Sequence, residues 1–304
     1  MKLEYRTLMK IGLAGVALCL TIGLLQVPFA SAQEPAKQAA PKGKGINQAP
    51  DPRVQQRTYK FADTNEDIPY GVFVSSKVTR DKKNPLIIAL HGLGGTHNSL
   101  LRGNALDLAE DGGYILVGPM GYNPRGWYGT PVGTPRAGKG AAPKGNAPKG
   151  NAPPNNDPPN LRELSEKDVM NVLGMIRKEF NVDDSRTYLM GHSMGGAGTL
   201  YLGTKHASNW AAIAAIAPAA FAMQANAATM LTPVKDTMPV IVTQGDADTA
   251  VPVANTRAWI EVMKELKMNH KYVEVAGAGH GDIITIGMRD IFAFFTEHQK
   301  PASR

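Results

Sequence analysis

Short apolar runs alternate with longer amphipathic segments along most of this chain. The runs predict strands at 57–61, 70–75, 86–90, 114–118, 187–190, 211–217, 240–243 and 272–275. Apolar residues at helical spacing predict helices at 163–180, 253–266 and 282–298, and Ser165 with Asp168 resembles a capping box just inside the first. Strands that alternate with helices predict an α/β fold, with a mostly parallel central sheet and helices on both faces.

The most informative motif is the G-x-S-x-G pentapeptide around Ser193. It follows the apolar run 187–190 and precedes 196–202, which can continue as a helix. In a strand–turn–helix of this kind the serine adopts a strained backbone conformation, and Gly191 and Gly195 relieve the crowding. The Ser193 hydroxyl is then exposed at the edge of the sheet as a candidate nucleophile. The alternative is a small-residue turn that only packs a helix against a strand.

A serine nucleophile needs a base and a carboxylate, and both candidates follow predicted strands. Asp248 comes after 240–243, and His280 comes after 272–275. The carboxyl ends of parallel strands meet at one edge of the sheet, where open α/β sheets bind their ligands. The chain order Ser193, Asp248, His280 is that of α/β-hydrolases. Two rivals for the carboxylate remain, Asp246, which more simply caps its loop, and Glu274, which lies in mid-strand.

A glycine-rich turn after the strand 86–90 supplies the candidate oxyanion site. In Leu90-His91-Gly92-Leu93-Gly94-Gly95 the glycines allow backbone amides to approach a developing negative charge. The amides of Leu93 and Met194 are the best pair, with that of Gly94 as a substitute for the first. We expect His91 to hold this loop and His192 to pack beneath the serine.

These motifs together resemble the secreted serine esterases of the α/β-hydrolase superfamily, near the polyhydroxyalkanoate-depolymerase-like and feruloyl-esterase-like groups. The resemblance spans about residues 59–297 and is specific for the triad more than for the substrate. It implies an enzyme that cleaves carboxylic esters through an acyl-enzyme. Prolyl-oligopeptidase-type serine peptidases share the core, as do dienelactone hydrolases, which usually carry cysteine as the nucleophile. A catalytically inactive hydrolase-like binding module is the alternative from a different class.

The first 32 residues read as a secretory signal peptide. Basic residues precede an apolar segment at 11–25, and Ala30-Ser31-Ala32 is a typical cleavage site. An uncleaved membrane anchor is the alternative. Cleavage would give a secreted or periplasmic protein without stable membrane insertion, and it would remove the only cysteine, Cys19. Stability would then rest on a core that a single domain over 53–300 can bury. Residues 33–52 read as a flexible leader.

A segment rich in Pro, Gly and Lys at 130–160 interrupts the predicted domain. It repeats Ala-Pro-Lys-Gly-Asn at 142–146 and 147–151, which predicts a disordered insert that acts as a spacer or as a lid. Just before it stand Tyr122, Trp127 and Tyr128, which either line the substrate pocket or anchor the loop.

The net charge of +7 does not change this interpretation. The excess lies largely in the signal peptide, the leader and the insert, and no basic helix or aromatic-interleaved basic stripe predicts nucleic-acid binding. The histidines lack metal-ligand spacing, and no phosphate-cradling loop is present, so we expect neither a metal nor a cofactor. The acyl and alcohol specificity and the oligomeric state are left open.

Overall fold

The computed structural model describes residues 49–132 and 157–301. The predicted signal peptide, nearly all of the leader 33–52 and most of the insert 130–160 lie outside the described residues. The predicted domain at 53–300 is otherwise covered.

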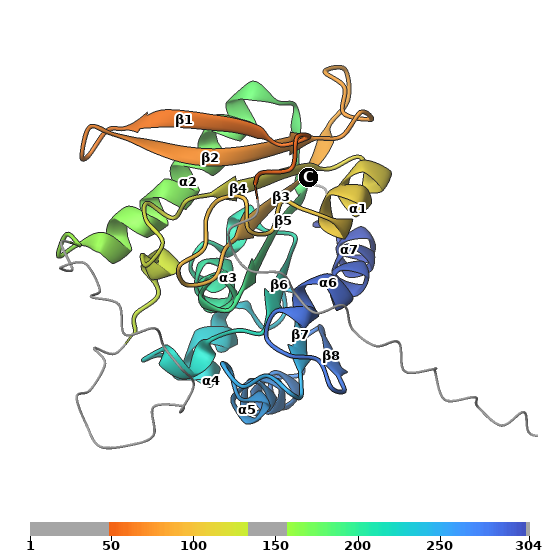
Figure 1. The fold of residues 1–304 in the computed structure, drawn as a ribbon. Coiled ribbons are helices and arrows are strands. Elements are labelled where there is room, and N and C mark those ends of the chain that lie inside the picture. Colours follow the sequence, from red (N-terminus) through yellow and green to blue (C-terminus); the bar gives the residue numbers. More distant parts are fainter. Residues whose placement is uncertain (1–48, 133–156, 302–304) are drawn as a thin grey trace, which may run out of the picture. The chain divides into compact units, whose positions relative to one another are not determined.

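One sheet of eight strands forms the centre of the described part, in the order β1-β2-β4-β3-β5-β6-β7-β8 (Figure 1). Strands β1 and β2 are antiparallel to each other, and β2 is antiparallel to β4, whereas every other neighbouring pair is parallel. The prediction of a mostly parallel sheet is therefore confirmed. The strands are β1 Gln55–Phe61, β2 Glu66–Val74, β3 Asn84–Leu90, β4 Ile115–Pro119, β5 Val182–His192, β6 Ala212–Ile216, β7 Val240–Gly245 and β8 His270–Val275.

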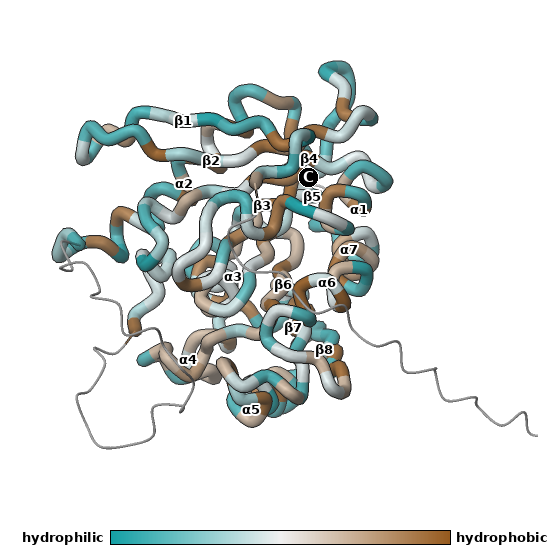
Figure 2. Tube along the Cα trace, in the orientation of Figure 1, coloured by the Kyte–Doolittle hydropathy of each residue, from teal (hydrophilic) through white to brown (hydrophobic). Residues whose placement is uncertain are grey.

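Helices cover both faces of the sheet. Helices α2 (Leu161–Glu179), α3 (Met194–Lys205) and α5 (Val253–Glu265) pack on one face, and α1 (Asn104–Gly112) and α7 (Met288–Glu297) on the other. Along β3, Leu86 and Ile88 face the first group, while Ile87 and Ala89 face the second. Because both faces are covered, β3 is buried along its whole length and reads as a continuous apolar run. The edge strand β1 is hydrophilic by comparison (Figure 2).

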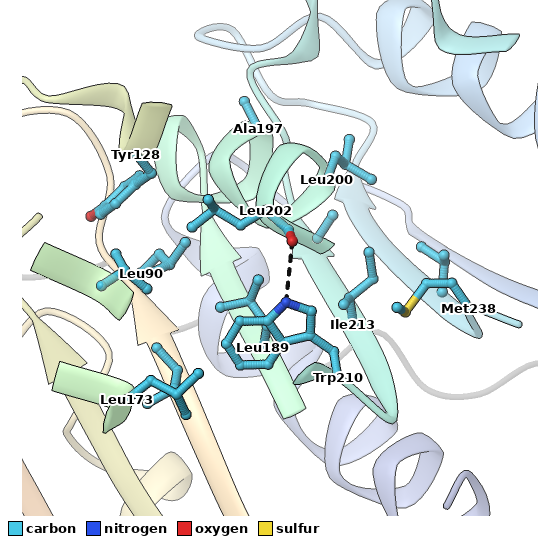
Figure 3. Close-up of a cluster of buried hydrophobic side chains, with 14 of the residues drawn as sticks. Leu90, Tyr128, Leu173, Leu189, Ala197, Leu200, Leu202, Trp210, Ile213 and Met238 are labelled. Atoms are coloured by element: carbon cyan, nitrogen blue, oxygen red, sulfur yellow. Dashed lines mark hydrogen bonds between the residues drawn. The ribbon is translucent and has the colours of Figure 1, made fainter. Parts of the chain in front are cut away.

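The apolar core on the α3 face holds the helix that follows Ser193 in place. Trp210 is fully buried there, and its indole N–H donates to the carbonyl oxygen of Leu202 at 3.1 Å (Figure 3). Leu200 and Leu202 of α3 are fully buried near Leu189 of β5 and Ile213 of β6. Strand β5 and helix α3 therefore form a rigid support on either side of the serine.

Two local predictions were wrong. The predicted helix 282–298 is divided at Gly287 into α6 (Asp282–Ile286) and α7, and a Cβ at that glycine would lie 3.0 Å from Thr243 Oγ1. The predicted capping box is absent as well. Helix α2 begins at Leu161, so Ser165 and Asp168 lie inside it, and their side chains bind a neighbouring loop instead. Other short elements include the helix α4 (Ala227–Leu231) and the 3-10 helices η1 (Trp127–Gly129) and η3 (Ala220–Ala222).

Candidate active site

Ser193 lies in the sharp turn between β5 and α3. Its backbone has φ 57° and ψ −114°, a conformation that L-residues rarely adopt. Its amide donates to the carbonyl oxygen of Ile216 at 2.9 Å, and its own carbonyl accepts from the amide of Ala219 at 2.9 Å. The strain is therefore held by bonds to the segment that follows β6.

The two motif glycines allow this turn to close. A Cβ at Gly191 would lie 2.3 Å from the carbonyl oxygen of Gly195, and one at Gly195 would lie 2.2 Å from that of Leu90. Both distances are far below van der Waals contact, and both involve backbone atoms that cannot move aside. The close approach of β3, β5 and α3 at this point explains the glycine spacing that the sequence displays.

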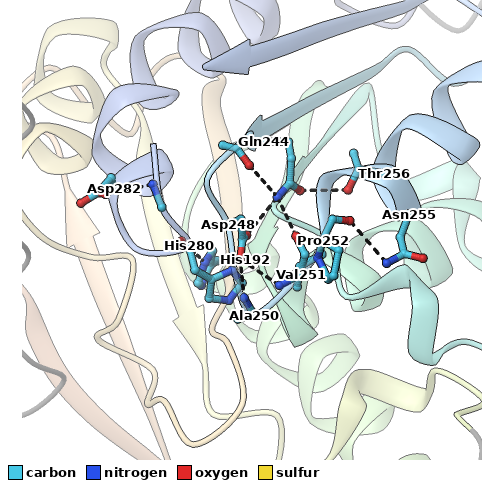
Figure 4. Close-up of polar contacts among 12 residues, drawn as sticks. His192, Gln244, Asp248, Ala250, Val251, Pro252, Asn255, Thr256, His280 and Asp282 are labelled. Atoms are coloured by element: carbon cyan, nitrogen blue, oxygen red, sulfur yellow. Dashed lines mark hydrogen bonds and ion pairs between the residues drawn. The ribbon is translucent and has the colours of Figure 1, made fainter. Parts of the chain in front are cut away.

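The structure brings Asp248 and His280 together. The Nδ1 atom of His280 lies 2.7 Å from Oδ2 of Asp248, whose side chain is fully buried (Figure 4). The carboxylate can only accept, so Nδ1 carries the proton, and the Nε2 atom of the neutral ring keeps a free lone pair. Burial alone would raise the pKa of Asp248, but the hydrogen bonds from His280 and from the amides of Val251 and Ala250 lower it below its usual value.

Gln244 is a part of this network that the sequence analysis missed. Its Nε2 atom donates to Oδ2 of Asp248 at 2.9 Å, and its Oε1 atom accepts from the hydroxyl of Thr256 at 2.9 Å. The other carboxylate oxygen accepts from the amides of Ala250 and Val251, each at 2.8 Å. The carboxylate therefore has four donors and a fixed orientation toward the imidazole.

The two rival carboxylates lie elsewhere. Asp246 is exposed, and its Oδ1 atom accepts from the amide of Gly277 at 2.6 Å, which ties its loop to the loop before His280. Glu274 forms an ion pair with Arg257 on the surface of β8. The geometry therefore brings Asp248 to the imidazole and neither of the other two.

His192 connects the serine turn to His280. Its Nε2 atom donates to the carbonyl oxygen of His280 at 2.9 Å, and the centroids of the two rings are 4.5 Å apart (Figure 4). Burial, together with repulsion by His280, lowers the pKa of His192 to about 3, so the ring is neutral at ordinary pH. Among the described residues, the Ser193 hydroxyl has no hydrogen-bond partner. Such bonds are often long in proteins without substrate and tighten when the substrate binds.

Two backbone amides next to the serine are available to an oxyanion. Those of Leu93 and Met194 make no hydrogen bond within the described part of the chain, and Met194 is the first residue of α3, where helix amides lack internal partners. The amide of Gly94 instead donates to the carbonyl oxygen of Pro124 at 3.0 Å, so it cannot substitute for that of Leu93. A Cβ at Gly92 would lie 3.3 Å from Cβ of Ser193, which brings this loop against the serine.

The three aromatic residues predicted at the substrate pocket differ in their positions. Tyr128 is fully buried, and its hydroxyl donates to the carbonyl oxygen of His91 at 3.0 Å, so it anchors the loop and offers a substrate no surface. The Tyr122 ring packs on Phe61 at 5.4 Å, and its hydroxyl donates to Glu66 at the start of β2. Trp127 is half-buried against the core.

Asp168 of α2 anchors the loop that carries these aromatic residues. Its buried carboxylate accepts from the hydroxyl of Tyr59 at 2.6 Å and from the amide of Tyr122 at 3.0 Å. Burial raises its pKa, and the hydrogen bonds from Tyr59 and from the amides of Tyr122 and Gly121 oppose that rise. Gly121, Tyr122, Trp127, Tyr128 and Gly129 all have positive φ, so this loop needs such anchors.

Replacement of Asp168 by asparagine is expected to lower the free energy of unfolding by about 1–3 kcal/mol, because the amide offers one acceptor oxygen where the carboxylate offers two. Urea denaturation followed by circular dichroism measures the change. Glu163→Gln, an exposed substitution on the same helix, is the matched control. Equal stability of the two variants would contradict the anchoring role.

The described residues form neither a membrane-spanning helix nor a metal-binding group of side chains. In residues 49–132 and 157–301, no helix is long and apolar enough to cross a bilayer. The same ranges contain no group of three His, Cys, Asp or Glu side chains arranged to hold a metal ion.

The sheet order, the helices on both faces and the serine turn after β5 define an α/β-hydrolase. The chain matches the Esterase family over residues 62–284, and it belongs to that family. Family membership confirms the prediction of a serine ester hydrolase with this fold. No curated protein sequence matches the chain significantly.

Solved structures with similar folds include three hydrolases. A thermostable esterase is 23% identical with a TM-score of 0.58, and the match covers 82% of this chain and 64% of that one, so this chain spans less than two thirds of its length. An S-formylglutathione hydrolase from Agrobacterium tumefaciens is 16% identical with a TM-score of 0.62, and the match covers 84% of this chain and 99% of that one. A ferulic acid esterase from Anaeromyces mucronatus is 18% identical with a TM-score of 0.60, and the match covers 84% of this chain and 93% of that one.

Proposed function

We propose that this protein hydrolyses carboxylic esters through an acyl-enzyme on Ser193, with His280 as the general base and Asp248 as its partner. The observation that carries the proposal is the 2.7 Å hydrogen bond between His280 and the buried carboxylate of Asp248, beside a serine with a strained backbone. Family membership and the esterases among the structural neighbours support the same reaction.

The reaction begins when Oγ of Ser193 attacks the carbonyl carbon of the ester and its proton passes to Nε2 of His280. Negative charge develops on the carbonyl oxygen, which accepts hydrogen bonds from the amides of Leu93 and Met194. The ester bond then breaks, and the leaving alkoxide takes the proton from His280. Water attacks the acyl-enzyme with the same base, which releases the acid and returns the proton to Ser193.

A fluorophosphonate probe tests this assignment directly, because it phosphonylates an activated serine. The expected result is stoichiometric labelling, with the modified peptide mapped to Ser193 by mass spectrometry, together with turnover of p-nitrophenyl acetate. A proline-linked p-nitroanilide in the same assay addresses the peptidase alternative. Labelling at another serine, or faster cleavage of the amide than of the ester, would contradict the proposal.

Loss of the His192 hydrogen bond is expected to slow the reaction. In His192→Phe a ring of similar shape remains but the donor to the carbonyl of His280 is lost, so the base is less well positioned. We expect kcat to fall by about 5- to 150-fold, the equivalent of about 1–3 kcal/mol, with little change in KM. Steady-state kinetics on p-nitrophenyl acetate from pH 6 to pH 9 measures this.

The conservative variant His192→Gln keeps a side-chain donor and should recover part of the rate. The loss in His192→Phe should be the same across this pH range, because His192 is already neutral throughout it. A change in KM alone would assign His192 to substrate binding instead.

We further propose that the protein is exported, with residues 1–32 removed as a signal peptide, 33–52 as a flexible leader and 53–300 as the hydrolase domain. Residues 130–160 would form an insert within that domain, between β4 and α2. The composition described above supports these boundaries. The mass of the purified mature protein tests them, with Gln33 expected as its first residue.

A further inference from the structure

Three large apolar side chains are exposed among the residues that the structure describes. The exposed fractions are 57% for Leu93, 54% for Phe221 and 38% for Ile286. An isolated exposed apolar residue needs no explanation, but all three belong to segments at the carboxyl ends of strands. They therefore gather at the edge of the sheet that carries Ser193.

Two of the three flank the serine directly. Leu93 follows Gly92, whose Cβ position is 3.3 Å from Cβ of Ser193. Phe221 comes two residues after Ala219, whose amide donates to the carbonyl oxygen of Ser193 at 2.9 Å. Strands β3 and β6, which precede these residues, are the two neighbours of β5 in the sheet. At normal strand spacing the two strands are about 10 Å apart, with β5 between them, so Leu93 and Phe221 follow strands on opposite sides of the one that leads into Ser193.

The position of His280 decides which part of an ester lies between these side chains. His280 must reach the leaving oxygen to protonate it, so the alcohol lies on the side of His280. The segment after His280 leads into α6, which contacts α7 on one face of the sheet, whereas η3, which carries Phe221, contacts α3 and α5 on the opposite face. The acyl group therefore extends toward Leu93 and Phe221.

We infer that Leu93 and Phe221 form a two-sided apolar clamp for the acyl chain, and that the protein prefers esters with an apolar acyl group of medium length over acetate esters. This inference rests on the proposed function. Side chains this exposed gain the most when a substrate covers them, and contact with each additional methylene raises kcat/KM. In this arrangement Leu93 has two separate roles, because its amide faces the oxyanion and its side chain faces the acyl chain.

The test compares kcat/KM for p-nitrophenyl hexanoate and p-nitrophenyl acetate as a ratio. The ratio is expected to exceed about 10 in the unmodified protein and to fall about tenfold in Phe221→Ser and in Leu93→Ser, which keeps the backbone amide. Ile286→Ser, an exposed apolar residue at the same edge but after β8, is the matched control and should keep the ratio within about twofold. A ratio near one in the unmodified protein, or an unchanged ratio in both clamp variants, would overturn the inference.

A pair of isomeric esters distinguishes the acyl side from the alcohol side. Methyl hexanoate and pentyl acetate have the same composition, but the apolar chain lies in the acyl part of one and in the alcohol part of the other. Phe221→Ser should slow hydrolysis of methyl hexanoate more than that of pentyl acetate, and the reverse would overturn the acyl assignment. Fluorophosphonate labelling of Ser193 with no change in either ratio would refute the clamp alone, whereas no labelling and no ester turnover would refute the proposed function with it.

Discussion

Replacement of Ser193 by alanine is expected to reduce kcat for p-nitrophenyl acetate by about a millionfold, to the residual rate that the oxyanion amides and substrate binding supply. The alanine retains the positive φ of the turn and the fold but removes the atom that forms the acyl-enzyme. The measurement is the initial rate at saturating ester, with fluorophosphonate labelling in parallel. Ser208→Ala, an exposed serine near the opposite end of α3, is the matched control and should keep full activity.

A rate for Ser193→Ala within about 100-fold of the unmodified enzyme would contradict this prediction, since the oxyanion site alone cannot supply so much. Circular dichroism of the variant shows whether it is still folded, which separates a loss of the catalytic group from unfolding. Because Ser193 is bonded through its backbone to Ile216 and Ala219, the variant should retain its structure.

Replacement of Asp248 by asparagine is expected to lower kcat by about ten-thousandfold. The asparagine amide would face Nδ1 of His280 with a donor or a weaker acceptor, which favours the wrong tautomer and leaves Nε2 protonated. The steady-state rate measures the loss. Asp246→Asn changes the same functional group two residues away and should cost less than about tenfold, because it disturbs only the loop contact with Gly277. Equal losses in the two variants would remove Asp248 from its assigned role.

The lowered pKa of Asp248 adds a dependence of stability on pH. A carboxyl group whose pKa is lower in the folded state than in the unfolded state stabilises the fold fully above its unfolded pKa of about 3.9. That contribution is lost as the pH falls through the folded value. The difference in unfolding free energy between the unmodified protein and Asp248→Asn should therefore shrink in acid, which urea denaturation at pH 7 and pH 3 can measure.

The sequence was sufficient to predict the fold. The central strands β3, β5, β6 and β7 are covered on both faces, so each contains a continuous apolar run that is easily recognised as a buried strand. The serine turn was equally predictable, since a Cβ at Gly191 or Gly195 would lie only 2.3 or 2.2 Å from a backbone oxygen. The assigned catalytic roles remain predictions. The geometry adds a direct contact between Asp248 and His280, which the order of the motifs could only suggest.

Contacts between distant segments could not be predicted. Ser165 and Asp168 have the spacing of a capping box, but both lie inside α2. There their side chains accept hydrogen bonds from backbone amides of the loop after β4. Gln244 reads as an ordinary residue at the end of a strand, and only the fold places it between Thr256 and Asp248. Tyr128 precedes the insert like a pocket residue, but it is fully buried, with α2 and α3 packed against it.

The bonds between the loops after β7 and β8 have a consequence for motion at the catalytic edge. The amide of Ala247 donates to the carbonyl oxygen of Ala278 at 3.1 Å, and the amide of Asp246 donates to the carbonyl oxygen of Val275 at 3.2 Å. The side chain of Asp246 also accepts a hydrogen bond from the amide of Gly277. The imidazole and its carboxylate therefore travel as one body when these loops fluctuate. Opening of these loops would leave the imidazole–carboxylate contact intact, and the separation between the imidazole and the serine would change only if the hydrogen bond from His192 to the carbonyl of His280 also broke.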